Sequence, residues 1–154
     1  MNVIYLVGQI SPKFPKTYKW REYIEQYFSG YEEIEIINPC NNDFNRQLLK
    51  DKKYAITNES RTNGIDLLVP KDYQFVQRSN IAIVNMNHYD INKPMIGSFY
   101  ELAWYYSQPS KAVIAFADNF NDYQCQHPFV KDSITTWCKD ETEACQFVEY
   151  YFTE

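Results

Sequence analysis

The segment from Gly97 to Ala103 (GSFYELA) has the residue types and spacing best suited to chemistry. Ser98 precedes Glu101 by three residues, the spacing of a capping box, in which each side chain bonds the other residue's backbone N–H. A carboxylate in the first turn of a helix also lies at the positive end of the helix dipole, which favours its ionised form. An ionised carboxylate can attack an anomeric carbon and form a covalent glycosyl-enzyme. The pattern alone leaves both interpretations open, helix cap and nucleophile.

Apolar, β-branched runs alternate with helical spacing along most of the chain. Strands are predicted over residues 2–7, 34–37, 81–86 and 112–116, and the first and third of them are expected to be buried. Helices are predicted over residues 17–28, 70–79 and 97–108, with one or two closing helices over 127–138 and 141–152. Residues 43–53 are compatible with a helix, and 56–64 have loop chemistry. Strands that alternate with helices predict an α/β fold with a mostly parallel sheet covered on both faces.

The 154 residues amount to about one domain, and no repeat or linker divides them, so residues 1–154 are expected to form a single domain. In a parallel sheet, ligands bind beyond the carboxyl ends of the strands. The loops at that edge are predicted at residues 8–15, 85–97 and 117–126. Gly8 begins the first of them and permits close approach of the backbone to a ligand.

These features together resemble the nucleoside 2-deoxyribosyltransferase family. The matching elements are Tyr5 and Gly8 in the first strand, Asp72 near the opening of a mid-chain helix, the strand IAIVNM at 81–86, and the motif G-S-x-Y-E-L-A at 97–103. The resemblance covers most of residues 2–130. It implies a flavodoxin-like, three-layer fold with a central parallel sheet of about five strands.

The resemblance also implies roles for individual residues. Glu101 matches the nucleophile that takes the deoxyribosyl group, and Tyr5 matches the tyrosine beside that carboxylate. Asp72 matches the aspartate that contacts the nucleobase, and it can pass a proton to the base as it leaves. The substrate-binding candidates nearby are Gly8, Gln9, which has an amide suited to a base edge, Gly97 and Ser98.

The sequence departs from the family at two places. Where the family has an Asn-x-Met element contributed by a neighbouring subunit, this chain has His127-Pro128-Phe129, so His127 and Phe129 are the candidates to bind the sugar. Where the family usually has an aspartate two residues before the motif's glycine, this chain has Met95. Asp90 and Asn92 are the nearby candidates to replace that aspartate. If neither does, a non-catalytic relative becomes an alternative.

The net charge of −5 argues against a nucleic-acid polymer as partner, since such proteins normally have a basic face. A local basic cluster, Lys13, Lys16, Lys19 and Arg21, is either a solvated helix face or a contact for a 5′-phosphate. No apolar run approaches a membrane span, and the N-terminus lacks the order of a signal peptide, so a cytoplasmic location is expected.

No metal or other cofactor is expected. The four cysteines show no C-x-x-C spacing, which favours structural thiols, and His88 and His127 are too isolated for a metal site. The expected partners are a nucleoside or nucleotide, a free nucleobase, and further copies of the chain, because the family forms homo-oligomers, dimers or hexamers, with shared active sites.

The leading functional prediction is transfer of a 2-deoxyribosyl group between nucleobases through a covalent intermediate on Glu101. One alternative is hydrolysis of a deoxynucleoside or its 5′-monophosphate by the same chemistry. An alternative of another class is a binding module that captures a nucleotide without turning it over.

Overall fold

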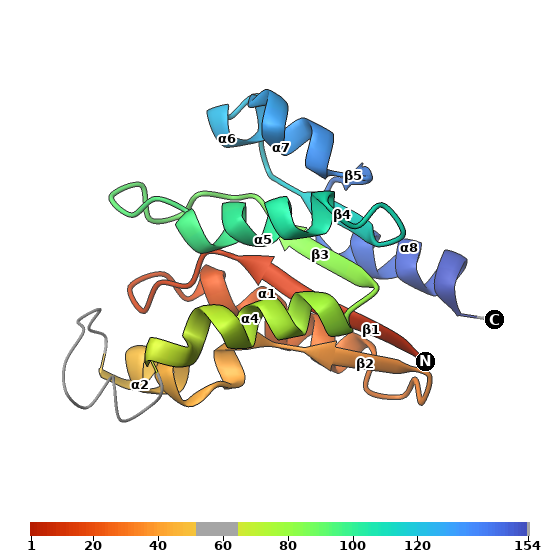
Figure 1. Ribbon diagram of the computed structural model, residues 1–154, viewed down its shortest axis with the longest axis horizontal. Helices are drawn as coiled ribbons and strands as arrows, with labels where there is room; N and C mark the ends of the chain where they lie inside the picture. The colour runs from red at the N-terminus through yellow and green to blue at the C-terminus, as the bar shows by residue number, and fades with distance from the viewer. Residues whose placement is uncertain (52–64, 154) are drawn as a thin grey trace.

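The computed structural model describes residues 1–51 and 65–153, and five parallel strands form its sheet (Figure 1). The strands are β1 (Asn2–Gly8), β2 (Ile34–Ile37), β3 (Ile81–Asn85), β4 (Ala112–Phe116) and β5 (Thr136–Cys138), in the spatial order β2-β1-β3-β4-β5. This is the flavodoxin-like order, with its switch point between β1 and β3. The predicted α/β class and parallel five-stranded sheet are therefore confirmed.

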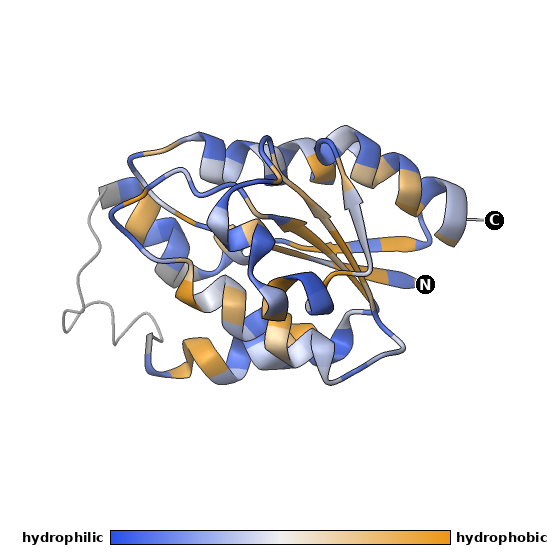
Figure 2. Cartoon of the chain, turned by 90° about the horizontal axis from the view of Figure 1, so that it is seen from above, coloured by the Kyte–Doolittle hydropathy of each residue, from blue (hydrophilic) through white to orange (hydrophobic). Residues whose placement is uncertain are grey.

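Helices cover both faces of the sheet. On one face lie α1 (Lys16–Tyr27) and α8 (Glu141–Phe152), and on the other lie α4 (Leu68–Arg78), α5 (Ile96–Tyr106) and α7 (Pro128–Ser133). The remaining described helices are α2 (Asp43–Asp51), α6 (Tyr123–Gln126) and two 3₁₀ turns, η1 (Pro39–Asn41) and η2 (Ile65–Leu67). Figure 2 shows hydrophobic strands between helices that carry both hydrophobic and hydrophilic residues, as expected of a sheet buried on both sides.

The alternation of side chains along β1 divides the core into two parts. Ile4 and Leu6 pack with Trp20 and the rest of the α1–α8 layer, whereas Tyr5 and Val7 pack in the layer of α4 and α5. This follows from the two-residue period of a strand, which sends neighbouring side chains to opposite faces. Tyr5 is thereby placed on the same side of the sheet as the helix that carries the GSFYELA motif.

Gly8 lies where β1 approaches β3 and α1 most closely. A Cβ atom at this position would lie 3.2 Å from Asn85 Cβ, from the Asn85 carbonyl oxygen and from Trp20 Cζ2. Such separations are tighter than ordinary van der Waals contact, so a larger residue would push the strand end away from its neighbours. Gly8 therefore serves packing at the end of β1 as well as lining the cavity described below.

Most predicted elements are present with boundaries shifted by one or two residues. The strands at 34–37 and 112–116 have the predicted bounds, and the tentative helix at 43–53 corresponds to α2. The helix predicted from residue 70 begins at Leu68 instead. The loop predicted over 56–64 lies outside the described residues.

The prediction of helix throughout 127–138 is wrong at its end. Only Pro128–Ser133 is helical, and Thr136–Cys138 forms β5 at the edge of the sheet, parallel to β4. The connection is fixed by Thr135, whose N–H donates to the Val113 carbonyl at 2.8 Å and whose hydroxyl accepts from the Val113 N–H at 2.9 Å. Consecutive β-branched residues, Ile134 to Thr136, favour this extended conformation.

The predicted capping box is also wrong. α5 begins at Ile96, Met95 is the N-cap residue, and no side chain caps the helix. Ser98 is therefore the third helical residue, and Glu101 lies in the second turn rather than the first. The helix dipole acts mainly within the first turn. The Glu101 carboxylate consequently lacks the stabilisation that the sequence pattern indicated, and burial governs its chemistry instead.

Candidate active site

A cavity of about 330 Å³ lies at the carboxyl end of β1. The elements around it are β1 and its loop, α1, α2, α4, and the loop that leads into α5. Its polar or charged lining residues are Gln9, Arg21, Asn45, Asp72, Lys93, Ser98 and Glu101, with the phenol of Tyr5. Its apolar lining includes Leu48, Leu68, Met95 and Ile96. This volume is near the lower limit for small-molecule sites and fits a small ligand.

Glu101 is almost completely buried in this cavity, and its Oε2 atom has no hydrogen-bond partner. Burial, with a smaller contribution from the charge of Asp72, raises the pKa of the Glu101 carboxyl to about 8. The hydroxyl of Tyr5 and the charge of Arg21 oppose this rise. The expectation of a carboxylate ionised by the helix dipole is therefore corrected: the buried Glu101 carboxyl, with a pKa of about 8, holds its proton up to neutral pH.

Tyr5 projects from β1 towards the same carboxyl group. Its side chain is fully buried and its hydroxyl oxygen has no hydrogen-bond partner in this conformation. Burial and the neighbouring Glu101 and Asp72 raise the pKa of Tyr5 well above its ordinary value, so the phenol stays neutral. A neutral hydroxyl that faces a carboxylate can donate to it and fix its orientation. The ring packs against Phe75 of α4, 5.9 Å between centroids.

Asp72 reaches the cavity from α4, and its Oδ1 atom is buried without a partner. Burial raises the pKa of Asp72 to about 6, while the adjacent Lys71 opposes the rise. A carboxyl group with a pKa near the working pH is suited to donate and accept a proton during a reaction. Asp72 and Glu101 thus form a pair of perturbed carboxyl groups in one cavity, a pattern typical of functional sites.

Unsatisfied polar atoms are concentrated in this cavity. Among the described residues, five buried side-chain atoms have no hydrogen-bond partner, and four belong to residues that line it. Those four are the Tyr5 hydroxyl, Arg21 Nε, Asp72 Oδ1 and Glu101 Oε2. Buried polar groups are normally bonded, and leaving one unbonded costs roughly 1–3 kcal/mol. These groups can therefore form hydrogen bonds with a polar ligand in the cavity.

The sequence groups Arg21 with three lysines, as part of a solvated helix face or a phosphate contact, and does not predict its place beside Glu101. Lys13, Lys16 and Lys19 are exposed, but Arg21 is 0% exposed and lines the cavity. The buried residues of α1 are Thr17, Trp20, Arg21 and Ile24, a helical stripe with the spacing i, i+3, i+4, i+7. The position of Arg21 within that stripe is the sequence signal that indicates its burial.

The loops that follow β1 and β3 are joined through the side chain of Gln9. Its Nε2 donates to the carbonyls of Asp90 and Lys93, both at 3.0 Å, and its Oε1 accepts from the Asp90 N–H at 2.9 Å. Asp90 Oδ2 in turn accepts from the Ser11 hydroxyl at 2.9 Å. Both N–H bonds of the Gln9 amide are thereby used within the protein, and its geometry is that of a loop anchor.

The two candidates to replace the missing aspartate do not line the cavity. Asp90 is buried in the loop network, and Asn92 is exposed. Met95 is buried and lines the cavity, so an apolar thioether occupies this part of the wall. Gly97 and Ser98, predicted from the motif, line the cavity beside Glu101.

His127 and Phe129 lie at a different hollow, of about 390 Å³, between α5 and the α6–α7 segment. His127 caps α7, its Nδ1 accepting from the Phe129 N–H at 3.3 Å. The imidazole packs edge-on between the rings of Tyr123 and Phe129. Within one chain these two predicted residues are thus not brought together with Glu101.

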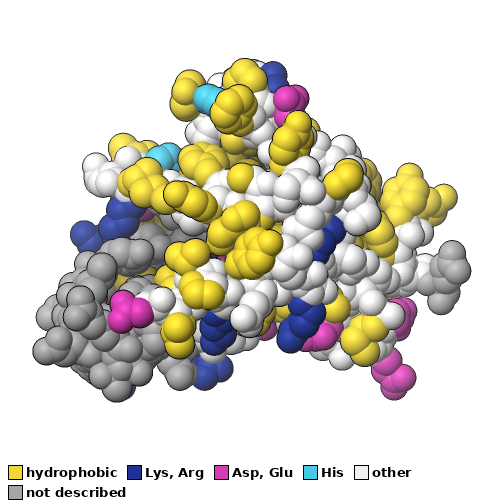
Figure 3. All heavy atoms as spheres, in the orientation of Figure 1, with side chains coloured by type: hydrophobic (Ala, Val, Ile, Leu, Met, Phe, Trp, Pro, Cys, Tyr) yellow, Lys and Arg dark blue, Asp and Glu magenta, His cyan; other side chains and the backbone are white. Residues whose placement is uncertain are grey.

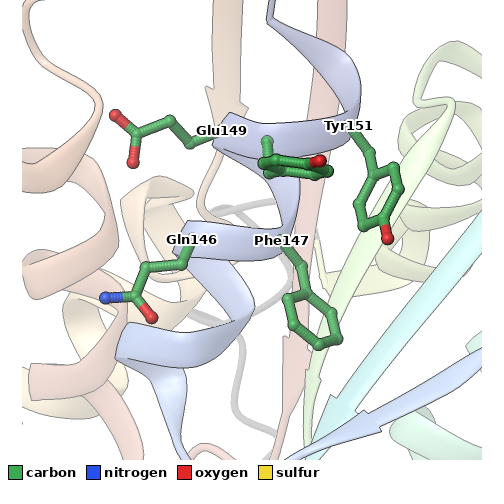
Figure 4. A pocket seen from close by; sticks show the side chains of 5 residues that line it. Gln146, Phe147, Glu149 and Tyr151 are labelled. Atoms are coloured by element: carbon green, nitrogen blue, oxygen red, sulfur yellow. The ribbon is translucent and has the colours of Figure 1, made fainter.

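A third hollow follows the outer face of α8 and contains none of the predicted residues (Figure 4). Gln146 and Glu149 project to one side of this helix, and Phe147 and Tyr151 to the other. Glu149 is engaged in structure, because it accepts hydrogen bonds from Tyr27, at 2.8 Å, and from Tyr31. A single helix lines this hollow, which brings no group of reactive side chains together.

The described residues contain no group of three or more His, Cys, Asp or Glu side chains placed to hold a metal ion. The four cysteines, Cys40, Cys125, Cys138 and Cys145, are buried and free. None of the helices in the described part of the chain has the length and apolar character needed to cross a membrane.

The order of the strands defines a flavodoxin-like fold. Asp72 and Glu101 lie together in a cavity at the carboxyl ends of the strands, where such folds bind small molecules. Solved structures make the likeness more specific. A 2-deoxyribosyltransferase of Leishmania mexicana superposes with a TM-score of 0.64 at 13% identity, over 99% of this chain and 100% of that chain. A 2-deoxyribosyltransferase of Bacillus psychrosaccharolyticus gives 0.58 at 19% identity, over 92% and 89%. A conserved protein of Enterococcus faecalis V583 gives 0.62 at 16% identity, over 97% and 98%.

Neither a protein-family model nor a curated protein sequence matches the chain. The chain has the fold of the 2-deoxyribosyltransferases over nearly its whole length, at low sequence identity, and this confirms the structural side of the resemblance noted from the sequence.

Proposed function

We propose that this protein transfers a 2-deoxyribosyl group between nucleobases through a covalent intermediate on Glu101. The observation that carries the proposal is the convergence of three unpartnered polar groups on one cavity: the Tyr5 hydroxyl, Asp72 Oδ1 and Glu101 Oε2. The shared fold of two 2-deoxyribosyltransferases supports the choice of reaction. The substrates are a deoxynucleoside, or its 5′-monophosphate, and a free base.

In the first step a carboxylate oxygen of Glu101 attacks C1′ of the sugar while the C1′–N bond to the base breaks. The electron pair of that bond goes to the base, which takes a proton from Asp72. Tyr5 holds the carboxylate in position. In the second step a nitrogen of the incoming base attacks C1′, the bond to Glu101 breaks, and Asp72 takes up the proton that the acceptor loses.

This sequence of steps requires one proton on the pair of carboxyl groups: Asp72 protonated and Glu101 ionised. Burial favours the opposite placement, because it raises the pKa of Glu101 more than that of Asp72. Both placements carry the same total charge, so binding of substrate can shift the proton between them without uptake from solvent.

The decisive experiment is base exchange. The protein is incubated with deoxyadenosine and cytosine, and the mixture is separated by chromatography. Deoxycytidine and adenine are the expected products. Adenine with free deoxyribose identifies a hydrolase, in which water replaces the acceptor base. Binding without turnover identifies the non-catalytic module, an alternative favoured by the apolar Met95 where a carboxylate is usual in the family. In Glu101→Gln exchange should stop, and wild-type turnover in that variant rules the mechanism out.

We further propose a homo-oligomer, a dimer or hexamer, in which the neighbour's His127 and Phe129 complete each cavity. Hydrophobic side chains gather over α4, α5 and the α6–α7 segment on the face seen in Figure 3. Several are large and more than half exposed in the single chain, namely Tyr100, Tyr106, Tyr123 and Phe129. Such a patch is typical of a protein interface.

Complementation tests the shared site. Two inactive variants, Glu101→Gln and the double variant His127→Ala with Phe129→Ala, are mixed under conditions in which subunits exchange. Recovery of activity is expected, because a mixed oligomer contains some cavities with both intact parts. A mixture that stays inactive although the subunits have exchanged excludes sharing.

A further inference from the structure

Arg21 carries a buried positive charge that its hydrogen bonds do not neutralise. Its Nη2 donates to the Gly8 carbonyl at 2.8 Å, and its Nη1 donates to the carbonyls of Gln9, at 3.3 Å, and Thr17. Its Nε atom has no partner, and no described carboxylate forms a salt bridge with it. A fully buried charge without a counter-charge is costly, so such residues are retained mainly where the charge has a use.

The hydrogen bonds of Arg21 explain why a side chain with several donors lies here, but they do not explain why that side chain carries a positive charge. They tie α1 to the carboxyl end of β1, three residues beyond Tyr5, and Trp20 stacks beside the guanidinium with 4.6 Å between Cζ and the ring centroid. Neutral donors can also bond carbonyl oxygens. The positive charge can act on groups in the cavity that Arg21 lines together with Glu101.

The groups that face Glu101 come from four elements. Tyr5 projects from β1, Arg21 from α1 and Asp72 from α4, while Tyr105 follows on α5 itself; Lys93, in the loop before α5, also lines the cavity. Asp72 opposes ionisation of Glu101, and Arg21 favours it. Arg21 also interacts with the buried thiol of Cys40, whose pKa is raised by burial. Glu101 is thus the carboxyl group in the cavity whose ionisation Arg21 assists.

We infer that Arg21 is a positioning residue for the proposed reaction: its guanidinium fixes the end of β1 and provides the counter-charge for the Glu101 carboxylate. The inference rests on the proposed function. A nearby positive charge favours the ionised nucleophile in the first step. In the second step it favours departure of Glu101 from C1′, because the carboxylate regains its negative charge when that bond breaks.

Two substitutions separate charge from hydrogen bonding. Arg21→Lys keeps the charge with fewer donors, and Arg21→Gln keeps donors without the charge. The matched control, Lys139→Gln, removes one exposed positive charge away from the cavity. Circular dichroism and thermal unfolding establish that each variant is folded. The readout is the pH profile of kcat/KM, whose two limbs report the ionisations of the carboxyl pair.

The upper limb, which Glu101 mainly sets, should move up by about one pH unit in Arg21→Gln, while the lower limb stays in place and Arg21→Lys and Lys139→Gln retain both wild-type limbs. An equal loss of activity at every pH in Arg21→Lys and Arg21→Gln, with unmoved limbs, would mean that Arg21 is purely structural and overturns the inference. Unchanged kinetics in Arg21→Gln also overturns it.

A second measurement does not depend on turnover. The carboxyl carbon of Glu101 is followed by ¹³C NMR during a pH titration of the wild type, Arg21→Lys and Arg21→Gln. The midpoint should be higher in Arg21→Gln by about one pH unit than in the other two. Equal midpoints overturn the electrostatic link even if the enzyme is active. A protein that shows the shift but neither transfers nor hydrolyses contradicts the proposed function alone.

Discussion

Asp72 and Glu101 enter one cavity from two neighbouring helices, α4 and α5, and each presents a buried carboxylate oxygen that has no hydrogen-bond partner. The pKa of the first is raised to about 6 and that of the second to about 8. Because the two groups share one site, these values describe successive ionisations of a pair. The pH behaviour of the protein follows from that relationship.

The pH profile of kcat/KM should be bell-shaped. Below about pH 6 both carboxyl groups are protonated and no nucleophile is present, whereas above about pH 8 both are ionised and no proton donor remains. The rate should therefore rise through the first value, fall through the second and peak at about pH 7. Initial rates of base exchange across pH 5 to 9.5, in buffers of constant ionic strength, provide the test. A flat profile would show that the pair does not control the reaction.

Substitution of the proton donor should depend on the leaving group. Asp72→Asn should slow release of adenine by about 10²–10⁴-fold, the usual contribution of general acid catalysis. A substrate with 7-methylguanine needs no proton, because its base leaves neutral from a cationic nucleoside. This substrate should retain most of its rate in Asp72→Asn, and the descending limb of the pH profile should disappear. Equal losses for both substrates would assign Asp72 to binding instead.

Loss of the buried carboxyl group should stabilise the protein at high pH. The ordinary pKa of 4.5 governs Glu101 in the unfolded chain, and a pKa of about 8 governs it in the folded one. The folded state holds its proton more tightly, so this group's contribution to stability is largest at low pH and falls as pH rises from 4.5 to 8. Glu101→Gln should therefore have nearly the wild-type Tm at pH 4.5 and a Tm higher by about 5 °C or more at pH 8.5.

Thermal unfolding at the two pH values measures this difference, with the exposed Glu32→Gln as a control for loss of one carboxylate. The control should change little at either pH. A Glu101→Gln variant that is less stable at pH 8.5 than the wild type would mean that Glu101 is paired in solution.

Loss of the loop anchor should weaken substrate binding more than chemistry. Gln9→Ala removes two bonds to carbonyls of Asp90 and Lys93 and one from the Asp90 N–H. The cost in stability should be about 1–3 kcal/mol, since the freed groups are largely buried. Because Lys93 and Met95 line the cavity, KM should rise severalfold while kcat changes less. A fall in kcat with unchanged KM would place Gln9 in the chemical step instead.

The sequence predicted best those parts that a continuous apolar run defines. β3 and β4 lie within one residue of the predicted ranges because a strand in the middle of a parallel α/β sheet is apolar on both faces. β5 has only three residues, and a β-branched run as short as Ile134 to Thr136 does not define a strand by itself, so pairing with β4 decides its conformation. A tertiary contact of this kind leaves little signal in the local sequence.

The site was predicted in part, for the same reason. Tyr5, Asp72 and Glu101 were proposed from a resemblance, and the fold places all three at one cavity. The ionisation of Glu101 was misjudged because burial, which outweighs the helix dipole, depends on packing by distant elements. Arg21 was overlooked because charged residues on a helix are usually exposed. Asp90 and Asn92 do not line the cavity, because the path of their loop, which the local sequence does not define, directs them elsewhere.

Side chains along β1 point alternately to the two faces of the sheet, so the residue that faces the cavity depends on its place in this alternation. Tyr5 faces Glu101 only because an odd number of steps separates it from Ile4 and Leu6, which face α1 and α8. Deletion or insertion of a single residue before Tyr5 within the strand would turn the phenol into the opposite layer and an aliphatic side chain into the cavity. The length of β1 before Tyr5 is therefore fixed, whatever the identity of the residues that fill it.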